Sequence, residues 1–151
     1  MRLWALILLL AAGPAHALSC APPDPIAAFN RFAAAEETYV AVYGVFTFDP
    51  NAMPGRFARS TSVDATFDGE GLDRDGFTGP VARRVTLDVA CALSWCGGLQ
   101  TGTPVLAFLE RQDDGLHLAL SPCQVAHFID ITAPDLRRIE ACFAAGRCPA
   151  E

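Results

Sequence analysis

Six cysteines behind an apolar leader constrain this chain more than any other feature of its sequence. They are Cys20, Cys91, Cys96, Cys123, Cys142 and Cys148. An even number of cysteines in an exported chain predicts a disulfide framework, and six cysteines allow fifteen different pairings. We expect Cys142 and Cys148 to close a local loop, because Gly146 between them permits the chain to reverse. The other pairings stay open.

Zinc binding is the alternative use of so many cysteines. The chain has no Cys-x-x-Cys pair and only two histidines beyond the leader, His117 and His127. Structural zinc sites are usually built from closely spaced cysteine and histidine pairs. The sequence therefore favours disulfides, and it predicts neither a metal site nor a cofactor.

The leader covers residues 1–17. A positive residue precedes a ten-residue apolar run, and small residues follow it. This pattern is typical of a secretory signal peptide, whereas a membrane-spanning helix needs about 20 apolar residues. Cleavage fits after Ala17 or after Ser19, and the position of Pro14 favours Ala17. We therefore expect an extracytoplasmic protein, periplasmic or secreted, with one domain over residues 18–151 and no membrane span.

Charge limits the partners of this domain. The chain has 17 acidic residues against 11 basic ones, which gives a net charge of −6. An acidic surface repels phosphate groups, so nucleic acid and anionic membrane surfaces are disfavoured as partners. The expected partner is therefore a protein or a glycan. The sequence does not indicate the oligomeric state.

Apolar patterning predicts a mostly β fold with a helix at each end. Asp24 and Pro25 begin a first helix with apolar spacing as far as Glu36-Glu37, and a second helix is expected between Thr132 and Gly146. Five strands are expected between the helices, with a glycine-rich acidic loop between the second and third strands. The strands are 39–48, 63–67, 85–91, 105–110 and 116–120, and the loop is 68–80. This order predicts a small antiparallel barrel or sandwich.

Few side chains offer catalytic chemistry. Ser121, His127 and Asp130 are the only nucleophile, base and acid that lie close together in the sequence, and no Gly-x-Ser-x-Gly elbow is present. His117 falls on the outward side of the fifth strand, where we expect it to be solvated. We therefore predict no catalytic residue, and a small extracytoplasmic hydrolase that uses His127 is the alternative.

The acidic loop could hold a calcium ion. Asp68, Glu70, Asp73 and Asp75 supply carboxylates, and calcium needs several oxygen ligands. Only a fragment of the helix-loop-helix calcium signature is present, however, and Arg84 stands at the position of its bidentate glutamate. A solvated loop is therefore expected.

Trp95 is the candidate contact residue. It lies between Cys91 and Cys96 and close to Gly97. An aromatic side chain on a loop fixed by disulfides loses little entropy on binding, which suits a contact residue. The alternative is that Trp95 closes one end of the sheet as a core residue.

Several short segments occur in an order that resembles one family. They are Cys20, Asp24-Pro25, Ala28-Phe29, the strand 39–45, Cys96-Gly97, Gly102, the strand segment 105–108, Asp114-Gly115-Leu116 and Cys123. In this order the chain resembles the netrin-like and tissue-inhibitor-of-metalloproteinases group, which are disulfide-bonded OB-fold domains. The chain departs from the inhibitors, which have Cys-x-Cys at their mature N-terminus, and Cys91 and the pair Cys142/Cys148 have no counterpart in that pattern.

The resemblance implies a five-stranded OB-like barrel and a disulfide from Cys20 to Cys96 or Cys123. In the inhibitors that the chain resembles, the first cysteine's amine and carbonyl chelate the zinc of the target. Cleavage after Ser19 would free Cys20 for that role, whereas cleavage after Ala17 would leave two residues in front of it. We therefore expect a non-catalytic binding module for a protein or glycan, with a metallopeptidase inhibitor acting through Cys20 as an alternative. The candidate binding residues are Cys20, Trp95 and Gly97.

Overall fold

The computed structural model describes residues 19–148, in which more residues lie in strands than in helices. The predicted signal peptide lies outside this range. The elements are α1 (Pro25–Ala33), β1 (Tyr39–Thr47), the 3-10 helix η2 (Pro50–Ala52), β2 (Thr61–Asp73), β3 (Gly76–Val89), β4 (Cys91–Ala92), β5 (Trp95–Cys96), β6 (Pro104–Gln112), β7 (Gly115–Leu120), β8 (His127–Phe128) and α2 (Ala133–Ala145). The prediction of a mostly β, disulfide-bonded fold with a helix at each end is confirmed. The five expected strands correspond to β1, β2, β3, β6 and β7.

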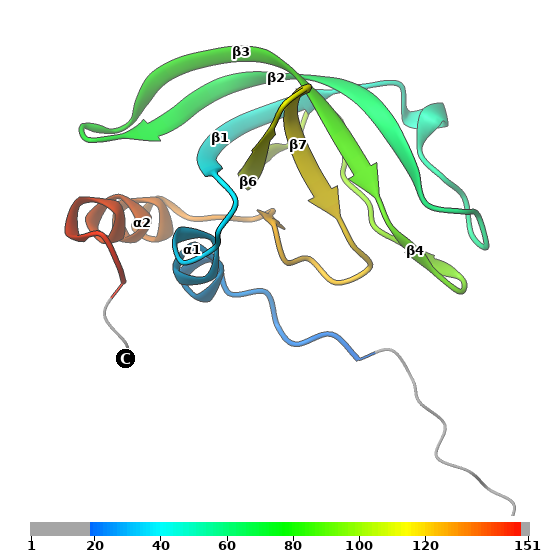
Figure 1. The fold of residues 1–151 in the computed structure, drawn as a ribbon, viewed down its shortest axis with the longest axis horizontal. Helices are drawn as coiled ribbons and strands as arrows, with labels where there is room; N and C mark the ends of the chain where they lie inside the picture. Colours follow the sequence, from blue (N-terminus) through cyan, green and yellow to red (C-terminus); the bar gives the residue numbers. More distant parts are fainter. Residues whose placement is uncertain (1–18, 149–151) are drawn as a thin grey trace, which may run out of the picture.

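Each of these five strands pairs with two others of the five. The pairings run from β1 through β2, β3, β7 and β6 and return to β1, while β8 pairs with β6. Four pairings of this ring are antiparallel, but β3 and β7 are parallel. The prediction of an antiparallel sheet is therefore wrong. After β3 the chain crosses through the β4–β5 hairpin and β6, and β7 then runs in the direction of β3 (Figure 1).

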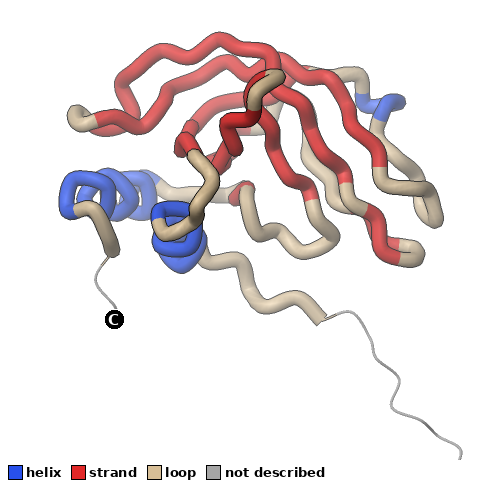
Figure 2. Tube along the Cα trace, viewed as in Figure 1, coloured by secondary structure: helices blue, strands red, loops and turns tan. Residues whose placement is uncertain are grey.

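Two apolar clusters hold the fold together. The first lies between the strands and contains Phe46, Phe67 and Leu118. The second lies between the sheet and the two helices, which sit side by side beneath one end of the curved sheet (Figures 1 and 2). The strand β6 contributes to both clusters, so residues 105–109 are all buried. A strand covered on both faces needs a continuous apolar run rather than an alternating one.

The segment 68–80 corrects the sequence prediction. It is not a loop but the distal half of a long β2–β3 hairpin that turns between Asp73 and Gly76. The Asp73 carboxylate stabilises this turn by accepting hydrogen bonds from the Asp75 backbone (2.8 Å) and the Thr78 hydroxyl (3.4 Å).

The glycines that suggested a loop are needed for close strand packing. Gly44 in β1 faces Gly69 in β2. A Cβ atom on either residue would overlap the backbone of the other strand and would lie 2.8 Å from Cζ of Phe67. Glycine therefore lets an aromatic ring cover this strand pair.

Both helices begin where the sequence predicts. Asp24 caps α1 by accepting hydrogen bonds from Ile26 N (2.9 Å) and Ala27 N (3.0 Å). Thr132 starts α2 in a capping box, and Gly146 ends α2 with a left-handed backbone (φ 75°). The first helix ends at Ala33, however, before the expected Glu36-Glu37.

All six cysteines are paired. The disulfides are Cys20–Cys123, Cys91–Cys96 and Cys142–Cys148. The expected local loop between Cys142 and Cys148 is present, and Cys20 joins Cys123 rather than Cys96. No cysteine is left free to bind zinc. Among residues 19–148, no helix has the length and apolar character needed to cross a membrane.

Candidate functional site

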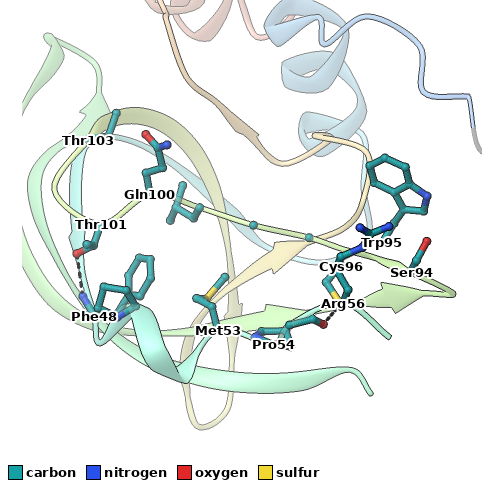
Figure 3. Close-up of a pocket in the computed structure, with 15 residues that line it drawn as sticks. Phe48, Met53, Pro54, Arg56, Ser94, Trp95, Cys96, Gln100, Thr101 and Thr103 are labelled. Carbon is teal, nitrogen blue, oxygen red and sulfur yellow. Dashed lines mark hydrogen bonds between the residues drawn. The ribbon is translucent and has the colours of Figure 1, made fainter. Parts of the chain in front are cut away.

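A cleft of about 800 Å³ opens at one end of the sheet. Figure 3 shows Trp95 and Ser94 at one end of it, Phe48, Thr101 and Thr103 at the other, and Met53 between them. The wall from the β1–β2 connection consists of Phe48, Pro50, Met53, Pro54, Gly55 and Arg56, and the opposite wall consists of residues 94–101 and Thr103.

The β1–β2 wall is held by short-range capping and by one bridge across the cleft. Asp49 caps η2 by accepting a hydrogen bond from Asn51 N (2.9 Å). Thr101 on the opposite wall accepts a hydrogen bond from Phe48 N (3.3 Å) and donates one to Phe46 O (3.3 Å). The end of β1 and the residue that follows it are therefore tied to the segment that faces them.

The opposite wall begins with the β4–β5 hairpin, which the Cys91–Cys96 disulfide closes. Ala90 at its root donates a hydrogen bond to Leu120 O (2.8 Å) and accepts one from Gly97 N (2.9 Å). Gly97 is buried, and a Cβ atom there would overlap the Leu120 carbonyl. Close packing against the end of β7 therefore fixes the base of the hairpin.

The two walls also contact each other through the hairpin disulfide. Cys96 Sγ lies 3.5 Å from Gly55 O, and Cys91 N donates a hydrogen bond to Ser60 Oγ (3.0 Å). Cys91 Sγ lies 3.7 Å from Arg59 O. Segment 55–60 thus runs alongside the hairpin, and the two project from the same end of the molecule (Figure 1).

Three large apolar side chains are exposed on these two segments. Trp95 is 61% exposed, so the alternative that it closes the sheet as a core residue is wrong. Leu93 at the hairpin tip is 89% exposed, and Phe57 on the β1–β2 connection is 75% exposed. Sequence reasoning missed Leu93 and Phe57, because a single apolar residue in a loop carries no periodic signal that separates surface from core.

The candidate binding residues do not all meet. Trp95 and Gly97 line the cleft, Gly97 through its backbone only, because it has no side chain and is buried. Cys20 is exposed but does not line the cleft. Its partner Cys123 follows β7 in the connection to β8.

His127 does not form a catalytic group with Ser121 and Asp130. The imidazole is 1% exposed, and neither ring nitrogen has a hydrogen-bond partner. Burial lowers the pKa of His127, although the nearby Gly98 backbone acts in the opposite direction. Ser121 instead donates its hydroxyl proton to the Cys123 carbonyl, and Asp130 is exposed. The nucleophile, base and acid of the alternative hydrolase interpretation are therefore not brought together.

His117 corrects the expectation of a solvated histidine, because it lies largely buried between two carboxylates. Its Nδ1 lies 2.8 Å from Asp88 Oδ2, and its Nε2 lies 2.9 Å from Asp114 Oδ1. Burial opposes protonation of the ring, but the hydrogen bonds and charges of Asp88 and Asp114 outweigh it and raise the pKa of His117. Ser62 donates to Asp88 (2.8 Å) rather than to the histidine, so this network does not activate a serine.

No group of three or more His, Cys, Asp or Glu residues within 19–148 is arranged to hold a metal ion. The carboxylates considered for calcium are spread along the β2–β3 hairpin and its turn. Comparison of the chain with protein-family models, with curated proteins and with solved structures found no match.

Proposed function

We propose that this chain is an exported, non-catalytic binding module that recognises a protein or a glycan through the cleft beside Trp95. The observation that carries the proposal is the exposure of this indole, at 61%, on a disulfide-closed hairpin at the edge of the cleft. Burying an exposed indole against a partner is favourable, and the closed hairpin reduces the entropy that binding costs.

The cleft has the size and lining of a binding site. Ligand sites commonly measure about 300–1,000 Å³, with mainly apolar walls and a few polar groups. Here Phe48, Met53 and Trp95 supply apolar surface, and Gln100 and Arg56 supply hydrogen-bond donors. Arg56 is the only ionisable side chain among the lining residues. An arginine stays protonated near neutral pH, so it does not act as a general acid or a general base. Binding fits this lining better than catalysis does.

The fold and the disulfides support the same proposal. A ring of five strands with one parallel pair fits an OB-like barrel, the fold implied by the resemblance to netrin-like domains. OB-type barrels bind ligands with their loops, including the loop between the first two strands. That loop forms one wall of this cleft. Three disulfides fit an oxidising, extracytoplasmic compartment.

Parallel capture experiments test the proposal. The oxidised wild-type protein, Trp95→Ala and Phe143→Ala would each be immobilised and exposed to extracytoplasmic extract and to a glycan array. Phe143 is a matched control, because it is a 40% exposed aromatic residue on α2, away from the cleft. The proposal predicts a ligand retained by wild type and Phe143→Ala and lost by Trp95→Ala. Ligands that all three proteins retain equally would contradict it.

A metallopeptidase inhibitor acting through Cys20 is the second candidate. The disulfide to Cys123 favours it, because that mechanism requires a bridged first cysteine. N-terminal sequencing of the exported protein tests it. A mature chain that starts at Leu18 would remove the chelating mechanism, whereas a start at Cys20 with inhibition of a zinc peptidase would support it.

A further inference from the structure

Two loop tips next to lining residues of the cleft present large apolar side chains from an unfavourable backbone conformation. Phe57 has a φ of 63° and Leu93 a φ of 55°. Glycine and asparagine adopt this left-handed region far more readily than other residues. Both side chains are mostly in solvent, so they contribute little packing to the fold. A role in the folded domain therefore explains neither residue, whereas contact with a partner explains both.

The two segments that carry these tips are joined at the base of the hairpin. The Cys91–Cys96 disulfide contacts the β1–β2 connection on both sides of Phe57, through Gly55 and through Arg59 and Ser60. Leu93 and Trp95 lie on the hairpin that this disulfide closes. The three apolar side chains therefore project from two segments that are fixed to each other at their bases.

The charge of this surface is opposite to that of the whole chain. The chain has a net charge of −6, yet residues 50–62 and 89–109, which include both tips and most of the cleft, contain no acidic residue. Asp49, between the lining residues Phe48 and Pro50, is the acidic residue next to these segments, and its carboxylate caps η2. Arg56 and Arg59 are exposed there, and neither forms an ion pair within the described residues. The Arg56 guanidinium lies 5.9 Å from the centre of the Phe57 ring. This arrangement favours an acidic partner.

We propose that this surface, which we term the tip surface (Met53, Arg56, Phe57, Arg59, Leu93 and Trp95), binds a protein segment that carries a bulky apolar side chain beside a carboxylate. The inference rests on the proposed function and names its partner class. A concave cleft accepts a projecting side chain, whereas a flat lipid surface would leave the cleft unfilled. The arginines would pair with the carboxylate, and Phe57, Leu93 and Trp95 would enclose the apolar group.

A displayed library of random 12-residue peptides tests this inference. Selection would use the oxidised wild-type protein. Enriched peptides would then be measured against the double variant Phe57→Gly/Leu93→Gly, against Arg56→Gln/Arg59→Gln, and against Phe143→Ala. Glycine fits the backbone at positions 57 and 93, so the double glycine variant is expected to melt at or above the wild-type temperature.

We expect the enriched peptides to combine Asp or Glu with Phe, Trp or Leu. Binding should weaken at least tenfold in the glycine and arginine variants and stay unchanged in Phe143→Ala. No enrichment, enrichment of basic peptides, or equal binding by all variants would overturn the inference. Binding of a glycan that requires Trp95 would also overturn it, and so would binding of anionic vesicles that requires Phe57 and Leu93. The glycan result would leave the proposed function standing. If no ligand of any kind depends on Trp95, both the proposed function and this inference are wrong.

Discussion

Gly97 and Leu120 are packed so closely that a methyl group on Gly97 would overlap the Leu120 carbonyl. This contact places the hairpin that carries Trp95 against the end of β7. We predict that Gly97→Ala lowers the free energy of unfolding by about 1–3 kcal/mol, the usual cost of overpacking. Urea unfolding would measure this. Gly98→Ala is the control, because nothing lies within 4 Å of a Cβ there. Equal effects of the two substitutions would show that the contact is not tight.

The disulfides should contribute unequally to stability. Cys20–Cys123 spans 103 residues, whereas Cys91–Cys96 spans only 5. The chain-entropy relation gives about 4.7 kcal/mol for a loop of this larger size and about 2 kcal/mol for the smaller one. Replacing Cys20 and Cys123 by alanine should therefore lower the melting temperature about twice as much as replacing Cys91 and Cys96. Thermal unfolding of the two double variants measures this. A larger loss on removing Cys91–Cys96 would contradict the claim that the longer loop stabilises the domain more.

The outline of the fold follows from local patterns, but the cleft does not. Caps at Asp24 and Thr132, and the alternation along the first part of β2 and the last part of β3, are local signals that the structure confirms. The distal β2–β3 hairpin was missed because its glycines serve strand packing, a contact between distant segments. The parallel β3–β7 pair depends on how the chain crosses the sheet, which periodicity does not encode.

The candidate site was predictable only in part. Trp95 was recognised because two cysteines flank it and predict a rigid loop. Phe57 and Leu93 had no such marker, since their importance comes from backbone conformation and exposure. His117 was expected in solvent because outward-facing positions on a strand are usually exposed. Carboxylates from β3 and from the β6–β7 turn instead cover it.

His127 should make the domain sensitive to acid. Burial lowers its pKa below the unfolded value of about 6.5, so the unfolded chain binds a proton that the folded chain resists. Stability is therefore lost as the pH falls below about 6.5. His127→Leu should remove this loss, because leucine does not bind a proton. Urea unfolding of both proteins from pH 4.5 to 7.5 measures the difference. If the difference in the free energy of unfolding between the two proteins is the same at every pH, this explanation is contradicted.

His117 should have the opposite effect. Asp88 and Asp114 raise its pKa above the unfolded value, despite the burial that opposes protonation. The stabilisation is fully present below about pH 6.5 and is lost as the pH rises through the folded pKa. His117→Gln should therefore destabilise the domain more at pH 5.5 than at pH 9, as measured by urea unfolding at the two values. A larger loss at pH 9 would show that the carboxylates do not hold a protonated ring.

Site-specific photo-crosslinking from the cleft tests the proposed binding function most directly. A benzophenone amino acid would replace Ser94, which lines the cleft beside Trp95, and in a second protein it would replace Phe143 on α2. Each protein would be exported by the cells that make it and then irradiated. A binding module that uses this cleft predicts a discrete crosslinked product from position 94 that is absent from position 143 and is lost when Trp95 is also changed to alanine. No product from position 94, or the same products from both positions, would contradict it.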